Sequence, residues 1–277
     1  YKEIWNYVGW NSVGTFAFMA NNQGITILLN MFFSTVVNAA RGIATTVSSQ
    51  VSGFVMNFQV AAGPQIYKLY AKGEYQQMNR LVCNTAKYSS YLLILIGLPV
   101  FIKTEILIKL WLGNIPEYVI PFIRITLIEL FFKAIDFPIG NGIHAFGKMK
   151  LPNITSSIAY ISVLPLTYIF LRLGASPVIA YIIACVSYPL AMACDLWILN
   201  KFSGFDIKFY LLNVPLKSIL IILLSAILPV FVSNSFEDGW LNLILTSAVC
   251  AMVSAVLVFY IGLDAEMREK VLKKEKN

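Results

Sequence analysis

Residues 241–263 read LNLILTSAVCAMVSAVLVFYIGL, which is 23 residues without a charged side chain. A helix needs about 20 apolar residues to cross the hydrocarbon core of a bilayer, so this stretch is long enough to cross it. Inside a bilayer an unpaired backbone amide has no water to bond, and an apolar stretch of this kind must therefore be helical. Seven other apolar stretches precede it, at residues 4–36, 39–67, 88–102, 118–146, 154–171, 178–199 and 214–232. The sequence predicts an all-α, polytopic transmembrane helical bundle of about eight spans.

The basic residues fall into alternate gaps between these stretches. Fifteen of the 21 lysines and arginines lie before the first stretch, after the second, fourth, sixth and eighth, or, for Lys217, at the start of the seventh. Because basic loops are retained on the cytoplasmic side of a membrane, this bias predicts that both ends of the chain are cytoplasmic. The net charge of +7 then follows from topology and from anionic headgroups, and we expect no nucleic-acid partner.

The segments outside the apolar stretches suggest little chemistry. Residues 74–87 have apolar side chains at helical spacing and predict an interfacial helix on the cytoplasmic face. Residues 264–277 predict a solvated cytoplasmic tail. The four cysteines show no metal-ligand spacing, so we expect neither a metal site nor a disulfide framework. The chain opens with Tyr1, and we expect it to be the later part of a longer membrane protein.

The first two stretches carry polar faces that helices exposed to lipid rarely have. At about 100° per residue, the polar residues of each stretch fall on one side of the helix. Such a face has two explanations: hydrogen bonds between helices, or the lining of a water-filled cavity. Two adjacent polar faces that include an arginine favour the cavity. The candidate cavity residues are Asn11, Thr15, Asn22 and Thr26 in the first stretch and Arg41, Thr45, Ser48, Ser52 and Gln59 in the second.

The fourth stretch places charges near the middle of a predicted span. Glu129, Lys133 and Asp136 occur at spacings of four and three, so they share one helical face. A charge at the bilayer centre costs at least about 2.5 kcal/mol on insertion scales, which makes these residues candidates for charge tuning or ion coupling. The alternative is a structural cluster in which Glu129 and Lys133 neutralise each other. Pro138 and the glycines after it predict a break in the helix beside these charges.

Several motifs resemble those of the bacterial oligosaccharide flippases of the polysaccharide-transporter family. This family shares a superfamily with the multidrug and toxic-compound exporters and the lipid II flippase. The similarity extends over essentially the whole chain and is strongest over residues 38–73 and 111–150. The motifs are NAARGIA at 38–44, FQ at 58–59, GPQIYKLYAKG at 63–73, LWLGNIPEY at 110–118 and AFGKMK at 145–150.

The resemblance implies a fold and a function. Members have two six-helix lobes arranged as a V around a central cavity, and some have two further helices at the C-terminal end. Residues 1–200 would then form the second lobe, 201–263 the additional helix pair and 264–277 the tail, with the first lobe absent from this chain. The family flips undecaprenyl-pyrophosphate-linked oligosaccharides from the cytoplasmic to the periplasmic leaflet of the bacterial inner membrane by alternating access. The resemblance thus implies a transporter for surface polysaccharide such as O-antigen, not an enzyme.

Within this family the cavities carry basic residues suited to pyrophosphate, and Arg41 fits that role. Transport would be coupled to a cation gradient, Na⁺ or H⁺, with no other cofactor. The partners would be the polyprenyl-linked oligosaccharide, membrane lipid and the first lobe. Glu129, Lys133 and Asp136 match no family motif.

Two other functions stay open. A drug or cation antiporter of the same fold should have a cavity of net negative charge with aromatic rings, and Arg41 and Lys133 argue mildly against it. A membrane-embedded glycan polymerase or a glycosyl or acyl transferase would need a catalytic acid or histidine on a sizeable outer loop, and the predicted outer loops are short. The identity of the glycan and of the coupling ion does not follow from the sequence.

Overall fold

The computed structural model describes residues 2–236, 239–264 and 267–269, and every regular element in these ranges is helical. This confirms the predicted all-α class. The long helices are α1 (Lys2–Phe32), α2 (Thr35–Ala71), α3 (Tyr75–Ile102), α5 (Val119–Ala145), α6 (Lys150–Arg172), α7 (Val178–Ser203), α9 (Lys217–Ser235) and α10 (Trp240–Leu257). The short elements are α4 (Thr104–Leu112), α8 (Ile207–Leu211) and two π-helical segments, η1 (Leu212–Leu216) and η2 (Val258–Gly262).

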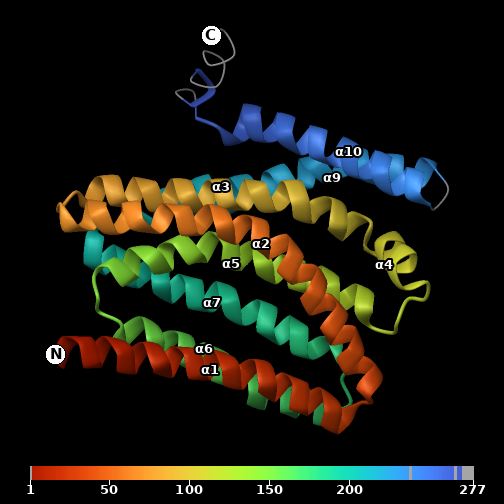
Figure 1. The fold of residues 1–277 in the computed structure, drawn as a ribbon, viewed down its shortest axis with the longest axis horizontal. Coiled ribbons are helices and arrows are strands. Elements are labelled where there is room, and N and C mark those ends of the chain that lie inside the picture. Colours follow the sequence, from red (N-terminus) through yellow and green to blue (C-terminus); the bar gives the residue numbers. More distant parts are fainter. Residues whose placement is uncertain (1, 237–238, 265–266, 270–277) are drawn as a thin grey trace.

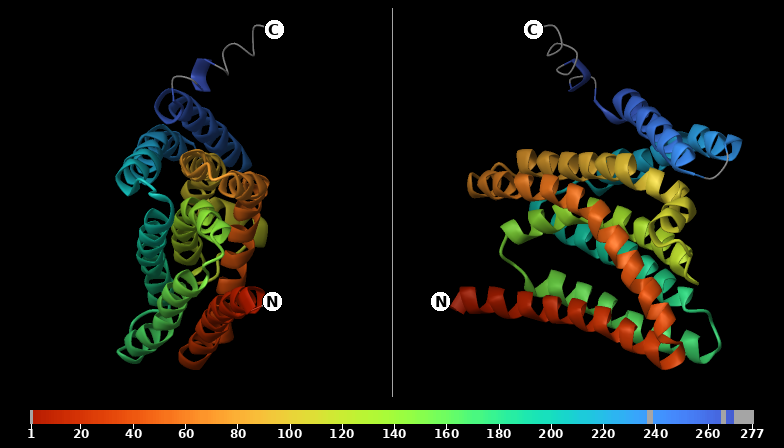
Figure 2. Two further views of the ribbon diagram at one scale, coloured as in Figure 1. Left: turned by 90° about the vertical axis from the view of Figure 1, so that its left-hand side faces the viewer. Right: turned by 45° about the vertical axis from the view of Figure 1, so that its right-hand side comes forward.

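The long helices lie alongside one another in layers (Figure 1). The α1 helix packs mainly on α6, α6 packs on α7, and α7 packs on α5. The α2 helix packs on α5 and α3, and the hairpin of α9 and α10 covers α3. The α1 and α2 helices meet at their connecting turn and then diverge, so α2 crosses from the α1 layer to the α3 layer (Figure 2).

Successive long helices run in opposite directions. The connections after α2, α5 and α7 therefore lie at the same end of the bundle as the N-terminus (Figure 1). Gly73 and Gly147 lie in the first and second of these connections and have positive φ angles of 74° and 66°. Because a residue without Cβ adopts this conformation at little cost, these glycines of the two sequence motifs allow the chain to turn back.

Five segments are long and apolar enough to cross a membrane: α3, α6, α7, Ile207–Ser233 and Trp240–Gly262. The predicted count of eight spans is thus not borne out within the described ranges. The remaining three predicted spans form the helices α1, α2 and α5, which are long enough but more polar. α5 carries four charges, and α1 and α2 carry the predicted amide and hydroxyl faces.

Two predicted breaks in the helices are absent. Residues 74–87 do not form a separate interfacial helix, because Tyr75–Ile102 is one continuous helix whose first half packs with Met78, Val82 and Ala86 in the core. The α5 helix also continues through Pro138. Proline cannot donate a hydrogen bond to the carbonyl four residues earlier, here that of Ala134. The Gln59 amide of α2 donates to this carbonyl at 2.6 Å instead, which leaves the freed group satisfied.

The main apolar core lies between α2, α3, α5 and α7, where Ile66, Met78 and Ile139 are fully buried. A smaller cluster that includes Tyr91 and Ile221 joins α3 to the α9–α10 hairpin. Most of the predicted tail, 264–277, lies outside the described residues.

Candidate functional site

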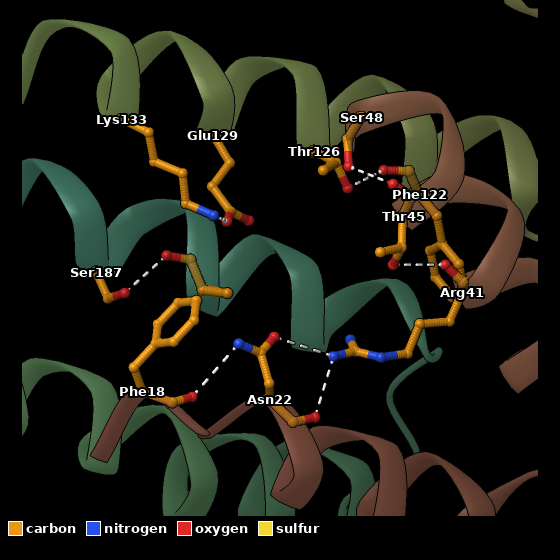
Figure 3. A network of polar contacts seen from close by, with 11 residues as sticks. Phe18, Asn22, Arg41, Thr45, Ser48, Phe122, Thr126, Glu129, Lys133 and Ser187 are labelled. Atoms are coloured by element: carbon orange, nitrogen blue, oxygen red, sulfur yellow. Dashed lines mark hydrogen bonds and ion pairs between the residues drawn. The ribbon is translucent and has the colours of Figure 1, made fainter. Parts of the chain in front are cut away.

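The candidate site begins with Arg41, in the second turn of α2. Because α2 starts directly after the turn from α1, this side chain can reach back to the adjacent helix. Its Nη2 donates to the backbone oxygen of Asn22 at 3.1 Å and lies 3.5 Å from the Asn22 amide oxygen. The guanidinium carbon also lies 5.8 Å from the centre of the Tyr181 ring of α7. The Arg41 side chain thus connects α1, α2 and α7 (Figure 3).

The contacts of Arg41 are polar or aromatic, not ionic. The structure has no ion pair between Arg41 and a carboxylate of the described residues, and the side chain is half-buried. A guanidinium can donate two parallel hydrogen bonds to one phosphate or carboxylate. Arg41 therefore keeps a full positive charge and spare donors for an anion.

A second group of charges lies on α5, facing α7. Lys133 Nζ is 2.6 Å from Glu129 Oε1, so the pairing considered from the sequence is present. Lys133 Nζ also lies 4.8 Å from the centre of the Tyr188 ring, which packs against Tyr160 of α6 at 6.0 Å between centres. In Figure 3 the side chains of Glu129 and Lys133 point toward α7, on the same side of α5 as Arg41 and Asn22. The ammonium is thus stabilised by a carboxylate and an aromatic face.

Asp136 is not part of the Glu129–Lys133 pair. Its carboxylate interacts electrostatically with Asp195 of α7, and each residue has a buried carboxylate oxygen without a hydrogen-bond partner in the described structure. Only 9% of Asp195 is exposed. Asp136 is half-buried, and two carboxylates that interact in such surroundings repel each other when both are charged.

Asp195 was missed by the sequence analysis. The signal was available, because Asp195 is the only charged residue in the apolar stretch at 178–199, and an ionisable residue inside a span is a functional candidate by default. Tyr181 and Tyr188 of the same helix were also missed. No property of the sequence distinguishes these two tyrosines from other aromatic residues in the apolar stretches.

The structure brings together only part of the predicted cavity face. Besides the Arg41–Asn22 contact, Asn38 donates to the backbone of Thr26 at 3.3 Å, which also joins α2 to α1. The remaining hydroxyls donate mainly to their own helix, such as Thr45 to Arg41 O and Ser48 to Thr45 O. Asn11, Thr15 and Thr45 are exposed, whereas Thr26, Ser48 and Ser52 are half-buried.

Gln59 was predicted to line the cavity, but its side chain is buried between helices. Only 4% of it is exposed, and its amide bonds the α5 backbone. It stabilises helix packing and lines no surface of the described chain. In the described ranges no group of three or more His, Cys, Asp or Glu residues has the arrangement of a metal site.

An all-helical fold with five helices able to cross a membrane indicates a multi-pass helical membrane protein. Comparison of the chain with protein families, curated proteins and solved structures gives no match.

Proposed function

We propose that this chain forms one wall of a membrane transporter that flips polyprenyl-pyrophosphate-linked oligosaccharides from the cytoplasmic to the periplasmic leaflet by alternating access. The observation that carries the proposal is Arg41, a half-buried guanidinium held by Asn22 and Tyr181 without a carboxylate partner among the described residues. Placing such a charge among apolar helices is costly unless it meets water or an anion, so its site suits a phosphate group.

Each part of the site has a role in this proposal. Arg41 binds the pyrophosphate, and the exposed amide of Asn11 and hydroxyls of Thr15 and Thr45 bind sugar hydroxyls. The carboxylates of Asp136 and Asp195 take up and release the coupling cation, H⁺ or Na⁺. Transport of this kind needs no covalent chemistry by the protein.

The polar helices are part of the same proposal. We infer that α1, α2 and α5 also cross the bacterial inner membrane, with their polar faces turned toward a cavity instead of lipid. The end of the bundle that holds the N-terminus and the connections after α2, α5 and α7 would be cytoplasmic, because these segments carry the excess of lysine and arginine. The opposite wall of the cavity would come from a first lobe.

A drug or cation antiporter is the second candidate. The carboxylates of Glu129 and Asp136 interact electrostatically with Tyr188, which packs on Tyr160. Asp195 interacts in turn with Asp136, and such a group suits an organic cation. Lys133 occupies the face of Tyr188 and neutralises Glu129, which weakens this reading.

The proposal is tested by export of surface glycan in cells that lack the chromosomal copy of the protein. Arg41→Ala in the full-length protein should abolish most export. Arg41→Lys should support partial export, because lysine keeps the positive charge but cannot donate two parallel hydrogen bonds to one phosphate. Arg172→Ala is the matched control, because Arg172 is exposed and its side chain donates to the Tyr168 hydroxyl at 3.3 Å. Glycan is normalised to the amount of protein in the membrane. Full export by Arg41→Ala contradicts the phosphate role, and a parallel loss of protein makes Arg41 a structural residue.

A further inference from the structure

A groove of about 690 Å³ lies between α3, α5 and α9, away from the Arg41 site. Its walls include Leu93, Leu127, Phe131 and Ala226, and Arg124 and Ser233 are the polar lining residues among those that the structure describes. The volume is within the range of about 300–1,000 Å³ that is typical of ligand sites. Because the lining is so apolar, the ligand that fits it is a hydrocarbon.

The groove is about one leaflet deep. Its lining runs from residue 124 to 132 on α5 and from 219 to 233 on α9. At 1.5 Å per residue these segments are about 12 and 21 Å long, compared with about 30 Å for the whole hydrocarbon core. This length suits one acyl chain of a phospholipid better than a much longer polyprenyl chain.

The polar end of the groove holds Arg124, which pairs with Glu105. Arg124 Nη2 contacts Glu105 Oε1 at a long 3.4 Å, and its guanidinium lies 5.9 Å from the Phe101 ring. Lys103 Nζ donates to the carbonyl of Ser233, which lies at the same end of the groove, at 3.4 Å. The Arg124 Nε atom is buried and has no hydrogen-bond partner in the described part of the chain. The Arg124 side chain as a whole is 38% exposed, so the accessible part of its guanidinium can donate to a phosphate oxygen.

We propose that this groove binds an anionic phospholipid, with one acyl chain between α3, α5 and α9 and the phosphate on Arg124. The inference depends on membrane insertion alone and not on the transported substrate. The charged residue Arg124 at one end of the groove matches the phosphate of such a lipid, and the apolar side chains along the rest of the groove match its acyl chain.

Native mass spectrometry of the full-length protein, titrated with phosphatidylglycerol or phosphatidylcholine, tests the proposal. Wild type should retain phosphatidylglycerol at least about tenfold better than phosphatidylcholine, a difference of about 1.4 kcal/mol. Arg124→Gln should remove this preference, since glutamine can still bond Glu105 but carries no charge. Ala226→Phe should fill the groove and lower retention of both lipids. Glu105→Gln should retain at least as much phosphatidylglycerol as wild type.

Arg172→Ala is the control, because it removes an exposed arginine far from the groove and should leave retention unchanged. Gel-filtration profiles and helical circular dichroism show whether each variant is folded. Equal retention of both lipids by wild type, or unchanged retention by Arg124→Gln, contradicts the headgroup site. Displacement of phosphatidylglycerol by an equal concentration of undecaprenyl phosphate overturns the proposal, because the groove would then prefer the polyprenyl chain.

Discussion

At the scale of single residues, Gln59 is a polar side chain that bonds the backbone of a neighbouring helix and does not line a cavity. Its amide bonds the Ala134 carbonyl, which Pro138 leaves without a donor. A polar residue and a proline that are far apart in the sequence thus form one structural unit. Arg41 differs, because among the described residues its guanidinium has polar or ring contacts with Asn22 and Tyr181 but no carboxylate partner, and it retains donors for an anion.

This relation predicts that Gln59→Leu is destabilising and that Pro138→Ala compensates for it. The single change leaves a buried carbonyl unsatisfied, which costs about 1–3 kcal/mol. In the double variant, residue 138 regains an N–H that can bond Ala134, so part of the thermal stability should return. Apparent Tm in detergent is the measurement, with Gln50→Leu, an exposed glutamine of the same helix, as control. Equal Tm for Gln59→Leu and wild type would show that the bond contributes nothing.

At the scale of elements, the sequence predicted the helices better than their boundaries. Apolar length alone located all eight long helices. The break expected after residue 87 is absent, and Lys87, Ser89 and Ser90 at this point of the continuous helix α3 are buried. Lys87 pairs with Asp264 at 2.9 Å, and Ser90 bonds Ser218 at 2.7 Å. Neither partner could be identified from the sequence, because pairs this far apart depend on how helices pack.

The contact between Ser90 and Ser218 predicts that paired cysteines at these positions form a disulfide between α3 and α9. Peptide mass spectrometry of the oxidised Ser90→Cys, Ser218→Cys variant should detect the linked peptides. The control is Ser90→Cys with Ser225→Cys, because residue 225 lies seven residues, or about 10 Å, further along α9. Efficient linkage of the control pair, or none in the first pair, would contradict the packing of the hairpin on α3.

At the scale of the whole molecule, Arg41, Glu129 and Asp195 lie on α2, α5 and α7, whereas α10 has no charged residue. The sequence located Arg41 and Glu129 from their position in apolar stretches. It missed Asp195, and it could not show that Asp195 interacts with Asp136, because their helices are separated by α6 in the chain. The distribution of lysine and arginine between the connecting segments predicts how the whole bundle is oriented in the membrane, and this orientation stays a prediction.

The proposed topology predicts the accessibility of three engineered cysteines in a background without the four native ones. Lys72→Cys and Lys208→Cys lie at the basic end of the bundle and should not react with a membrane-impermeant thiol reagent in intact cells. Asn114→Cys, in the exposed connection between α4 and α5 at the other end, should react. All three should react after the membrane is permeabilised. Labelling of Lys72→Cys in intact cells would reverse the orientation.

The most direct measurement of the central claim is flipping of a fluorescent polyprenyl-pyrophosphate oligosaccharide in proteoliposomes that contain the full-length purified protein. Access of an external glycosidase reports the leaflet in which the sugar lies. Wild type should move the labelled lipid between leaflets faster than protein-free vesicles, and Arg41→Ala should reduce this rate at least about tenfold, whereas Arg172→Ala should not. No acceleration by wild type, together with exchange of an organic cation for H⁺ or Na⁺ in the same vesicles, would contradict the flippase and favour the antiporter.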